Sequence, residues 1–282
     1  MKSVVVTGAN GFIGREVCGY FRTLGYRVIE LVRTGVASDR TALWRLGDGL
    51  PAHLRDVDVV IHLASATLVE RGDLSGAFRC DVDGSRILIE SVRDVRRSGR
   101  QIRLIFLSSQ SSNRNAVSAY GRSKWAIEGM LDRDDEIIVR PGLVYADRPT
   151  SVFALFERFA RLPLVPVIRS RACIQPIHVR ELVECLAQIA DMERPQRLFE
   201  LGAVDAIDLR EAICVSARRA GRAPPKFIPV PERVLRLGTL AFDRLFRPAT
   251  SITERLEGLI ALSPMDTRES LDALARKLAP FE

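Results

Sequence analysis

Tyr120 and Lys124 lie four positions apart in the segment AYGRSKWAIEGML, whose pattern predicts a helix. Side chains at i and i+4 share one face of a helix, so the lysine ammonium can lie beside the phenol. A nearby positive charge lowers the pKa of a tyrosine from about 10, which makes the phenol usable as a general acid or base near neutral pH. The pair therefore predicts a proton-transfer site, with two ordinary exposed side chains as the alternative.

Ser109 lies eleven residues before Tyr120, in the SSQSS segment that follows the apolar segment QIRLIFL, which predicts a strand. A hydroxyl at the carboxyl end of a sheet strand can hydrogen-bond a substrate carbonyl and orient it toward Tyr120. Arginine supplies nearly all of the 42 basic residues, yet position 124 is a lysine. A compact ammonium can both tune a phenol and reach a ribose hydroxyl. Ser109, Tyr120 and Lys124 are therefore the candidate catalytic residues.

A glycine-rich turn, VVVTGANGFIG, joins an all-apolar segment to an amphipathic helical pattern near the N-terminus. Gly8 permits a tight turn, Gly11 lets backbone amides approach a pyrophosphate, and Gly14 allows the helix to pack closely. The N-terminus of the helix also attracts negative charge. This arrangement predicts a dinucleotide site, and three turn glycines without a ligand are the alternative.

The end of the second apolar segment, RVIELVRTG, bears on which dinucleotide fits. NAD-binding folds place an acidic residue there to bind the ribose hydroxyls, whereas an arginine accommodates the 2′-phosphate of NADP. Here the strand ends in Val32, Arg33 and Thr34, and Glu30 lies two residues too early. The sequence therefore favours NADP over NAD through Arg33, with a solvated arginine as the alternative.

Short β-branched segments alternate with helical patterns over residues 3–107, which predicts an α/β fold with a Rossmann-type, doubly wound parallel sheet. EIIVRPGLVY adds a strand, and ACIQPIHV and RLFELG predict two further strands that return to the sheet. We expect a dinucleotide-binding domain over 1–150, rejoined by 173–204. A smaller, mostly helical C-terminal cap that binds substrate is expected over 205–282, with 151–172 contributing.

Composition narrows the class of protein. The 282 residues are 47% hydrophobic and carry a net charge of +7, but the arginines are spread along the chain, so we expect no nucleic-acid partner. Apolar stretches fall short of the roughly 20 residues that span a bilayer, and the N-terminus enters a strand at once, so a cytoplasmic protein is expected. The five cysteines show no metal-ligand spacing, so we expect free thiols and no metal. A homodimer is left open.

The motifs TGANGFIG, HLAS, SS before Tyr-x-x-x-Lys, and RPGLVY together resemble the extended short-chain dehydrogenase/reductase superfamily, specifically the NAD-dependent epimerase/dehydratase group, up to about residue 205. The resemblance implies an NAD(P)-dependent oxidoreductase or epimerase that acts on a secondary alcohol or ketone, sugar nucleotides included. It places Ser109, Tyr120 and Lys124 on the catalytic positions. The residues it implies for the cofactor are Gly8, Gly11, Phe12, Ile13 and Gly14 at the pyrophosphate, Asp48 at the adenine, Leu63, Ala64 and Ser65 at the ribose, and Pro141 to Val144 at the nicotinamide.

Several positions depart from the pattern of that group. Asp81 in DVDGS stands where the group usually has asparagine, and Gln110 and Ser111 replace an acidic pair of the dehydratases, which disfavours dehydration. Ile174 stands where epimerases carry an arginine for the substrate pyrophosphate. The arginines that can replace it are Arg158, Arg161, Arg169 and Arg171.

The C-terminal part suggests a second hypothesis. QPIHV and TSITERLEGLIALSPMDT also resemble the NADPH-binding accessory subunit of respiratory complex I, which implies a dinucleotide-binding accessory or regulatory protein with little or no turnover. Residues 234–246, VLRLGTLAFDRLF, form a basic amphipathic pattern. Packing onto the cap is the favoured interpretation of this segment, and contact with a membrane or a partner is the alternative.

Overall fold

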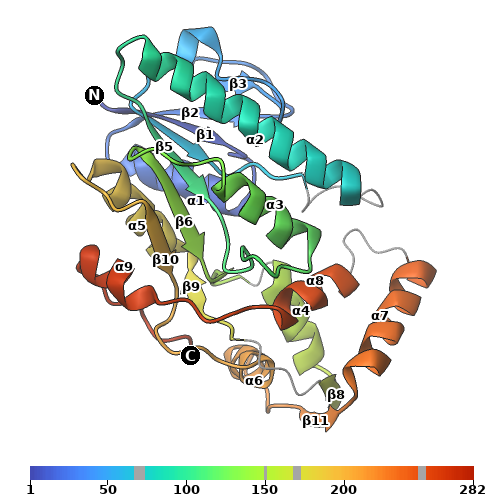
Figure 1. The fold of residues 1–282 in the computed structure, drawn as a ribbon. Coiled ribbons are helices and arrows are strands. Elements are labelled where there is room, and N and C mark those ends of the chain that lie inside the picture. Colours follow the sequence, from blue (N-terminus) through green and yellow to red (C-terminus); the bar gives the residue numbers. More distant parts are fainter. Residues whose placement is uncertain (67–73, 149–150, 168–172, 247–251) are drawn as a thin grey trace.

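A central parallel sheet organises the chain in the computed structural model, which describes residues 1–66, 74–148, 151–167, 173–246 and 252–282 (Figure 1). The strands run in the order β10-β6-β5-β4-β1-β2-β3, and every neighbouring pair is parallel. They are β1 (Ser3–Thr7), β2 (Arg27–Val32), β3 (Thr41–Leu43), β4 (Val59–His62), β5 (Arg103–Leu107), β6 (Glu136–Pro141) and β10 (Leu198–Leu201). The predicted doubly wound sheet is confirmed, and its strand order reverses between β1 and β4, where such sheets bind ligands.

Helices cover both faces of this sheet, which explains why its strands read as continuous apolar runs. The covering helices are α1 (Phe12–Thr23), α2 (Leu74–Arg97), α3 (Ala119–Glu128) and α5 (Val179–Asp191). Side chains alternate across a strand, so Val4 and Val6 pack in the core with α1 and α5, while Val5 packs on the other face with α2 and α3 (Figure 1).

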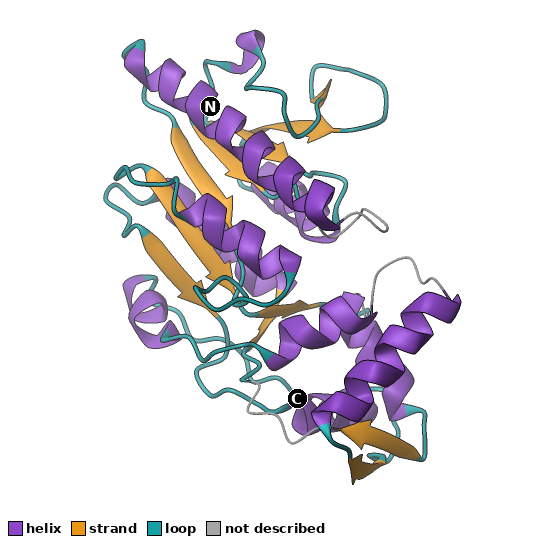
Figure 2. Ribbon diagram, turned by 45° about the vertical axis from the view of Figure 1, so that its right-hand side comes forward, coloured by secondary structure: helices purple, strands orange, loops and turns teal. Residues whose placement is uncertain are grey.

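A second, smaller group of elements forms the cap (Figure 2). It contains α4 (Ser151–Ala160), β8 (Leu164–Val167), α6 (Leu209–Arg219), β11 (Lys226–Pro229), α7 (Glu232–Phe246) and α8 (Ile252–Ile260). Phe153, Phe156 and Ile213 lie in its core, where α4 packs against α6. The cap is mostly helical, as predicted, but β8 and β11 pair in parallel. The sequence did not reveal this small sheet because each strand contains a proline, a residue that normally argues against a strand.

Two segments differ from the expected arrangement. β9 (Pro176–His178) pairs with β7 (Leu143–Tyr145) and not with the central sheet, so β10 alone returns to it. The C-terminal helix α9 (Thr267–Ala273) packs against β10, and Leu271 and Leu274 join the core on that face of the sheet. The predicted division into two domains stays a prediction, and in this fold residues 267–274 lie against the sheet.

A buried ion cluster fixes the amino-terminal end of β6 to α2. The Glu136 side chain is fully buried, and Arg93 donates to both of its oxygens, from Nε and Nη2 at 2.7 Å each. Arg96 adds a third contact at 3.1 Å. This end of the sheet lies opposite the carboxyl edge where the candidate catalytic residues lie, so the cluster is an element of stability.

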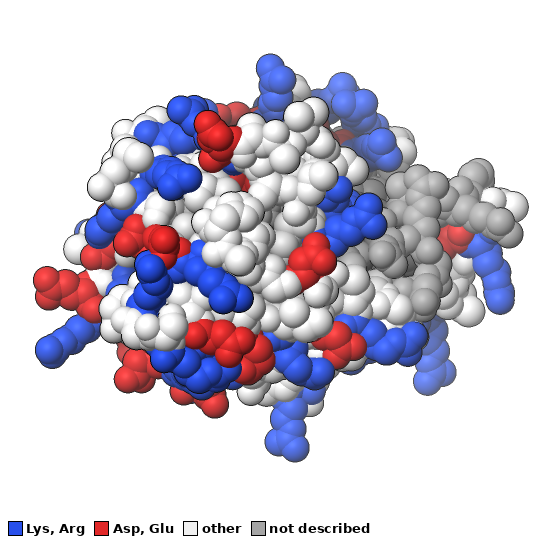
Figure 3. All heavy atoms as spheres, turned by 90° about the horizontal axis from the view of Figure 1, so that it is seen from above, with Lys and Arg blue, Asp and Glu red and all other residues white. Residues whose placement is uncertain are grey.

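Acidic and basic side chains alternate over the face of the molecule seen in Figure 3. Exposed ion pairs of the molecule include Arg86–Asp83 and Lys2–Asp191. In the described ranges, no helix has both the length and the apolar character needed to cross a membrane.

Candidate active site

The Tyr120–Lys124 pair lies on α3, which begins just after the end of β5. Ser118 caps this helix by accepting a hydrogen bond from the Gly121 amide at 3.1 Å. The Lys124 ammonium is buried, 5.5 Å from the centroid of the Tyr120 ring and 4.6 Å from that of Phe106. It donates a hydrogen bond to the Leu107 carbonyl at 3.0 Å. The helical spacing therefore brings phenol and ammonium together at the carboxyl end of β5, as predicted.

Ser109 lies two residues beyond β5 and meets the same phenol. A hydrogen bond with Ser109 lowers the pKa of Tyr120, and the Ser109 hydroxyl is 3.0 Å from that of Ser111. The structure thus brings together the three residues that the sequence selected for catalysis. They lie at the edge of the sheet where a doubly wound fold binds its ligands.

The protonation of this cluster differs from the expectation that Lys124 lowers the pKa of Tyr120. Burial raises the pKa of Tyr120 above its usual value, and the Asp81 charge raises it further. Burial also lowers the pKa of Lys124 to about 8, although Asp81 and Glu128 act in the opposite direction. The sequence could not reveal this because burial, the largest cause, arises only on packing. Tyr120 is consequently a neutral phenol throughout the physiological range.

Asp81 is a buried carboxylate at the centre of the site. It lies on α2 and accepts hydrogen bonds from Ser65 at 2.9 Å, from the Ala66 amide and from Ser123 at 3.3 Å. These contacts connect the loop after β4 to α3 one residue before Lys124. The sequence analysis singled out Asp81 only because the group usually has asparagine at this position. That difference was the one sequence feature that pointed to this residue.

The glycine-rich turn forms a cradle in which Gly8 and Gly14 leave no room for a larger residue. Gly8 has φ +67°, and a Cβ there would lie 3.0 Å from the Ala64 nitrogen. A Cβ on Gly14 would lie 2.2 Å from the Gly8 carbonyl oxygen. Phe12 and Ile13 open α1, and the residue before them, Gly11, provides no side-chain cap, so the amides of the first turn remain open to an anion. The cradle fits a dinucleotide pyrophosphate.

Thr7 and His62 hold the floor of this cradle. The Thr7 hydroxyl accepts from the Leu63 and Ala64 amides, each at 3.1 Å, and therefore donates to Nδ1 of His62 at 2.8 Å. Nε2 of His62 then carries the proton and donates to Ser85 at 2.9 Å. Burial lowers the pKa of His62 to about 3, so this histidine is neutral and structural. His178 is structural as well, because it caps α5 in a capping box with Glu181.

The residues expected at the adenosine lie at the ends of β2 and β3. Arg33 is exposed directly after β2. Glu30 forms an ion pair with Arg22, so its carboxylate is already engaged. Asp48 is exposed in a turn after β3, where it accepts a hydrogen bond from the Arg45 amide at 2.8 Å.

The segment expected at the nicotinamide is fixed by two glutamines. The Pro141 carbonyl accepts from the Gln110 amide at 2.8 Å, and the Gln175 carbonyl accepts from the Leu143 amide at 3.1 Å. The Gln110 side chain donates hydrogen bonds to the carbonyls of Cys173 and Ser263. Gln110 stands where dehydratases carry an acid, and here it connects three segments of the chain. Val144 is half-buried in β7. The sequence motif QPIHV contains Gln175 but did not indicate this role.

Two of the four expected anion-binding arginines lie among the described residues. Arg158 and Arg161 are exposed at the end of α4 and just beyond it. Arg169 and Arg171 lie outside the described residues. Within those residues, no three His, Cys, Asp or Glu side chains are grouped as metal ligands.

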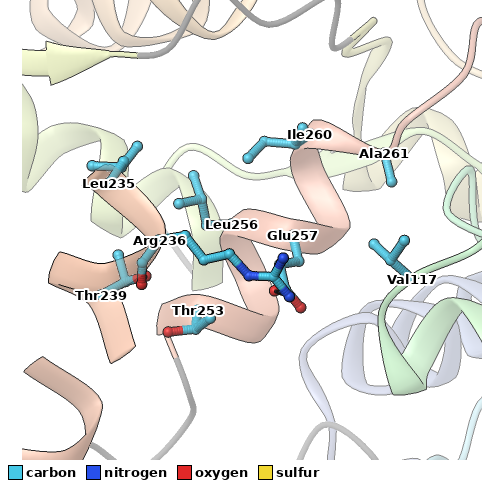
Figure 4. A pocket seen from close by; sticks show the side chains of 9 residues that line it. All are labelled: Val117, Leu235, Arg236, Thr239, Thr253, Leu256, Glu257, Ile260 and Ala261. Carbon is cyan, nitrogen blue, oxygen red and sulfur yellow. Dashed lines mark hydrogen bonds and ion pairs between the residues drawn. The ribbon is translucent and has the colours of Figure 1, made fainter. Parts of the chain in front are cut away.

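An apolar cavity of about 150 Å³ lies between α7 and α8, on the side of α8 that meets α3 (Figure 4). Its lining consists of Val117, Leu235, Arg236, Thr239, Thr253, Leu256, Glu257, Ile260 and Ala261. Val117 is three residues before Tyr120, and a Cβ on Gly258 of α8 would lie 3.6 Å from the hydroxyl of Ser118. The cavity is therefore adjacent to the start of the helix that carries the candidate catalytic pair.

Known proteins similar to this chain agree with the fold. The model of the NAD dependent epimerase/dehydratase family matches residues 4–202. The chain is 29% identical to the ceramide reductase of Caulobacter vibrioides over 253 residues, which are 81% of this chain and 74% of that protein. It is 32% identical to the UDP-2-acetamido-2,6-beta-L-arabino-hexul-4-ose reductase of Pseudomonas aeruginosa over 156 residues, or 55% of this chain and 37% of that protein.

A similar solved structure is a human epimerase family protein with NADPH. It superposes with a TM-score of 0.71 at 15% identity and covers 99% of this chain and 96% of its own. At that identity the likeness concerns the fold, whereas the family match extends over most of the chain. The chain therefore belongs to the NAD dependent epimerase/dehydratase family and is an NAD(P)-dependent oxidoreductase or epimerase.

Proposed function

We propose that this protein is an NADP(H)-dependent reductase that converts a ketone into a secondary alcohol, with Ser109, Tyr120 and Lys124 as its catalytic residues. The observation that carries the proposal is the meeting of these three side chains at the carboxyl end of β5, beside the cradle made by Gly8 and Gly14. Ser109 donates a hydrogen bond to the substrate carbonyl and fixes its direction. Tyr120 gives its proton to the same oxygen as the alcohol forms.

The protonation of the cluster supports the reducing direction. Burial raises the pKa of Tyr120, so the phenol keeps its proton at neutral pH and is ready to donate it. Lys124, whose pKa is lowered by burial to about 8, is still mostly charged at neutral pH. In this charged form the Lys124 ammonium would donate a hydrogen bond to the nicotinamide ribose. When bound, the reduced nicotinamide dinucleotide supplies the hydride.

For the cofactor, we propose NADP over NAD. The Gly8, Gly11 and Gly14 cradle, together with Phe12 and Ile13, would hold the pyrophosphate at the start of α1. Arg33 would bind the 2′-phosphate, because Glu30 is engaged by Arg22 and cannot serve the ribose hydroxyls. The remaining contacts would come from Asp48 at the adenine, Leu63, Ala64 and Ser65 at the ribose, Tyr120 and Lys124 at the nicotinamide ribose, and Pro141 to Val144 at the nicotinamide.

For the substrate, we propose a ketone with an apolar portion that binds in the α7–α8 cavity. Val117, Leu235, Leu256, Ile260 and Ala261 give part of the lining an aliphatic surface, beside the Arg236–Glu257 ion pair. The relative named ceramide reductase, which matches most of this chain, supports an amphiphilic substrate. A sugar nucleotide is the alternative suggested by the second relative. Against it, Ile174 at the expected position of the pyrophosphate arginine is fully buried.

The test combines cofactor binding with turnover. Binding of NADPH and NADH is followed by fluorescence, and NADPH oxidation is then measured with long-chain ketones and with sugar-nucleotide ketones. We expect turnover of an amphiphilic ketone, and Tyr120→Phe should lower kcat by about 10²- to 10⁴-fold with the NADPH Kd unchanged. Tyr20→Phe, a half-buried tyrosine on α1, is the matched control. If no ketone is reduced, the second hypothesis of a binding protein replaces this one. If Tyr120→Phe turns over like wild type, Tyr120 is not the proton donor.

A further inference from the structure

Helix α7 presents a row of apolar side chains to solvent. Val234, Leu237, Ala241 and Leu245 recur at intervals of three or four residues, so they share one face of the helix. Val234 is 58% exposed, Leu237 67% and Leu245 77%. Both ribbon views place α7 at the outer edge of the molecule (Figures 1 and 2). Packing onto the cap, the interpretation favoured from the sequence, therefore does not account for this face.

The opposite face of α7 is the one that the cap uses. Leu235 and Thr239 line the cavity toward α8, and Arg236 pairs with Glu257 of α8 at 2.8 Å (Figure 4). Asp243 accepts a hydrogen bond from the Thr253 amide at the start of α8, at 3.0 Å. The cap therefore meets α7 through Leu235 and through polar side chains, whereas Val234, Leu237 and Leu245 face solvent. An exposed apolar face of an amphipathic helix is typical of a surface that contacts a partner or a membrane.

Basic residues border the exposed apolar face. Arg233 and Arg244 are exposed, and with Leu237 and Leu240 they recur at i, i+4, i+7 and i+11, so all four lie along one line of the helix. Arginines at the margin of an exposed leucine-rich face are the arrangement by which interfacial helices bind anionic lipid headgroups while their apolar side chains enter the acyl boundary.

The same charges disfavour a second copy of this chain as the occupant. In an antiparallel two-fold pairing of α7 about its centre, Arg233 of one copy would face Arg244 of the other. Two such contacts between like charges would lie at the ends of a short apolar strip. A membrane surface has no such conflict, because its phosphate groups are negative.

We propose that the outward face of α7 docks on an anionic lipid surface. The docking does not depend on the reaction proposed above, but it would place the α7–α8 cavity one helix diameter, about 10 Å, from the lipid. An amphiphilic ketone could then pass from the surface into the cavity on the other side of α7 without crossing bulk water.

Vesicle co-sedimentation of the full chain tests the docking. We expect binding to vesicles of equal parts phosphatidylcholine and phosphatidylglycerol, weaker binding to phosphatidylcholine alone, and a fall in binding with added salt. Leu237→Asn with Leu240→Asn should lower the partition coefficient by about tenfold or more, because two apolar side chains leave the acyl boundary. Leu24→Asn with Leu43→Asn, two exposed leucines elsewhere on the molecule, should bind like wild type.

A second vesicle-binding experiment tests the contribution of the arginine charges with the double variant Arg233→Gln and Arg244→Gln. Binding to the anionic vesicles should fall by about fivefold per arginine, whereas binding to phosphatidylcholine alone should not change. Arg218→Gln with Arg222→Gln, two exposed arginines at the end of α6 and just beyond it, should have no effect. Tyr120→Phe should bind vesicles like wild type, which separates docking from catalysis.

Three results would overturn the docking. They are no vesicle binding by wild type, equal loss from both leucine pairs, and a dimer in solution that the α7 leucine variant converts to a monomer. The last result would assign the face to a second copy.

Discussion

The ammonium of Lys124 lies 5.5 Å from the centroid of the Tyr120 ring and donates a hydrogen bond to the Leu107 carbonyl at 3.0 Å. The two side chains are neighbours, yet the hydrogen bond of the lysine ammonium goes to the end of β5. The charge of Asp81 acts on both side chains and raises the pKa of each. The family residue at that position is usually asparagine, so the site of this protein contains one additional buried negative charge.

The first prediction concerns the pH dependence that Asp81 sets. Burial lowers the pKa of Lys124 to about 8, so the reductase rate should fall as pH rises through about 8 and the ammonium loses its proton. Asp81→Asn removes a charge that favours the protonated form of both Lys124 and Tyr120, so the alkaline limb of the kcat profile should move to lower pH. Asp83→Asn, an exposed change two residues away, is the control. A limb that stays in place or moves upward contradicts the role of Asp81.

The second prediction compares two glycines of α1. A Cβ on Gly14 would lie 2.2 Å from the Gly8 carbonyl oxygen, so Gly14→Ala should displace the turn, lower the Tm and weaken dinucleotide binding by at least about tenfold. Gly19 lies on the same helix with no neighbouring atom within 4 Å of its Cβ position. Gly19→Ala should therefore stabilise the protein by up to about 1 kcal/mol through helix propensity and leave binding unchanged. Calorimetry and fluorescence titration measure both effects, and similar behaviour of the two variants would argue against the cradle.

The third prediction separates the two dinucleotides. If Arg33 binds a 2′-phosphate, Arg33→Ser should raise the NADPH Kd by about tenfold or more and leave the NADH Kd nearly unchanged. Arg27→Ser, at the amino end of the same strand, removes an equal charge from the opposite edge of the sheet. Equal losses for NADPH and NADH, or tighter binding of NADH by wild type, would show that Arg33 does not select the cofactor.

The sequence predicted the elements whose cause is local. Apolar runs such as SVVVT and RVIELV are strands because both of their faces are buried, and Tyr120 meets Lys124 because four residues make about one helical turn. Contacts between distant segments were not predictable in this way. Asp81 reaches Ser65 and Ser123 only because α2 packs against the loop after β4 and also against α3. The raised pKa of Tyr120 has the same origin, since burial depends on the whole assembly.

Two other features of the fold differ from the sequence prediction, namely the β8–β11 pair and the packing of α7. Pro166 and Pro229 concealed the β8–β11 pair, because proline usually marks a break and is tolerated here only in short edge strands. An amphipathic pattern in residues 234–246 predicted packing, but a pattern cannot say which part of the apolar face meets the cap. In the fold, Leu235 faces α8 and Leu237 faces solvent.

The last prediction concerns stability and uses the two glutamates that share Arg93. Burial alone would raise the pKa of Glu136, but hydrogen bonds and charge from Arg93, with Arg96, lower it below the usual value. The stabilisation is therefore complete above the unfolded pKa of about 4.3 and is lost as pH falls through the lower folded value. At pH 7, Glu136→Gln should cost about 3 kcal/mol, because Arg93 and Arg96 lose their buried carboxylate and keep only the more exposed Glu90, Asp132 and Asp135. Glu90 is 48% exposed, and Glu90→Gln should cost less than about 1 kcal/mol. Urea unfolding at several pH values tests this contrast, and equal costs for the two variants, or a Glu136 cost that does not shrink in acid, would contradict the assignment.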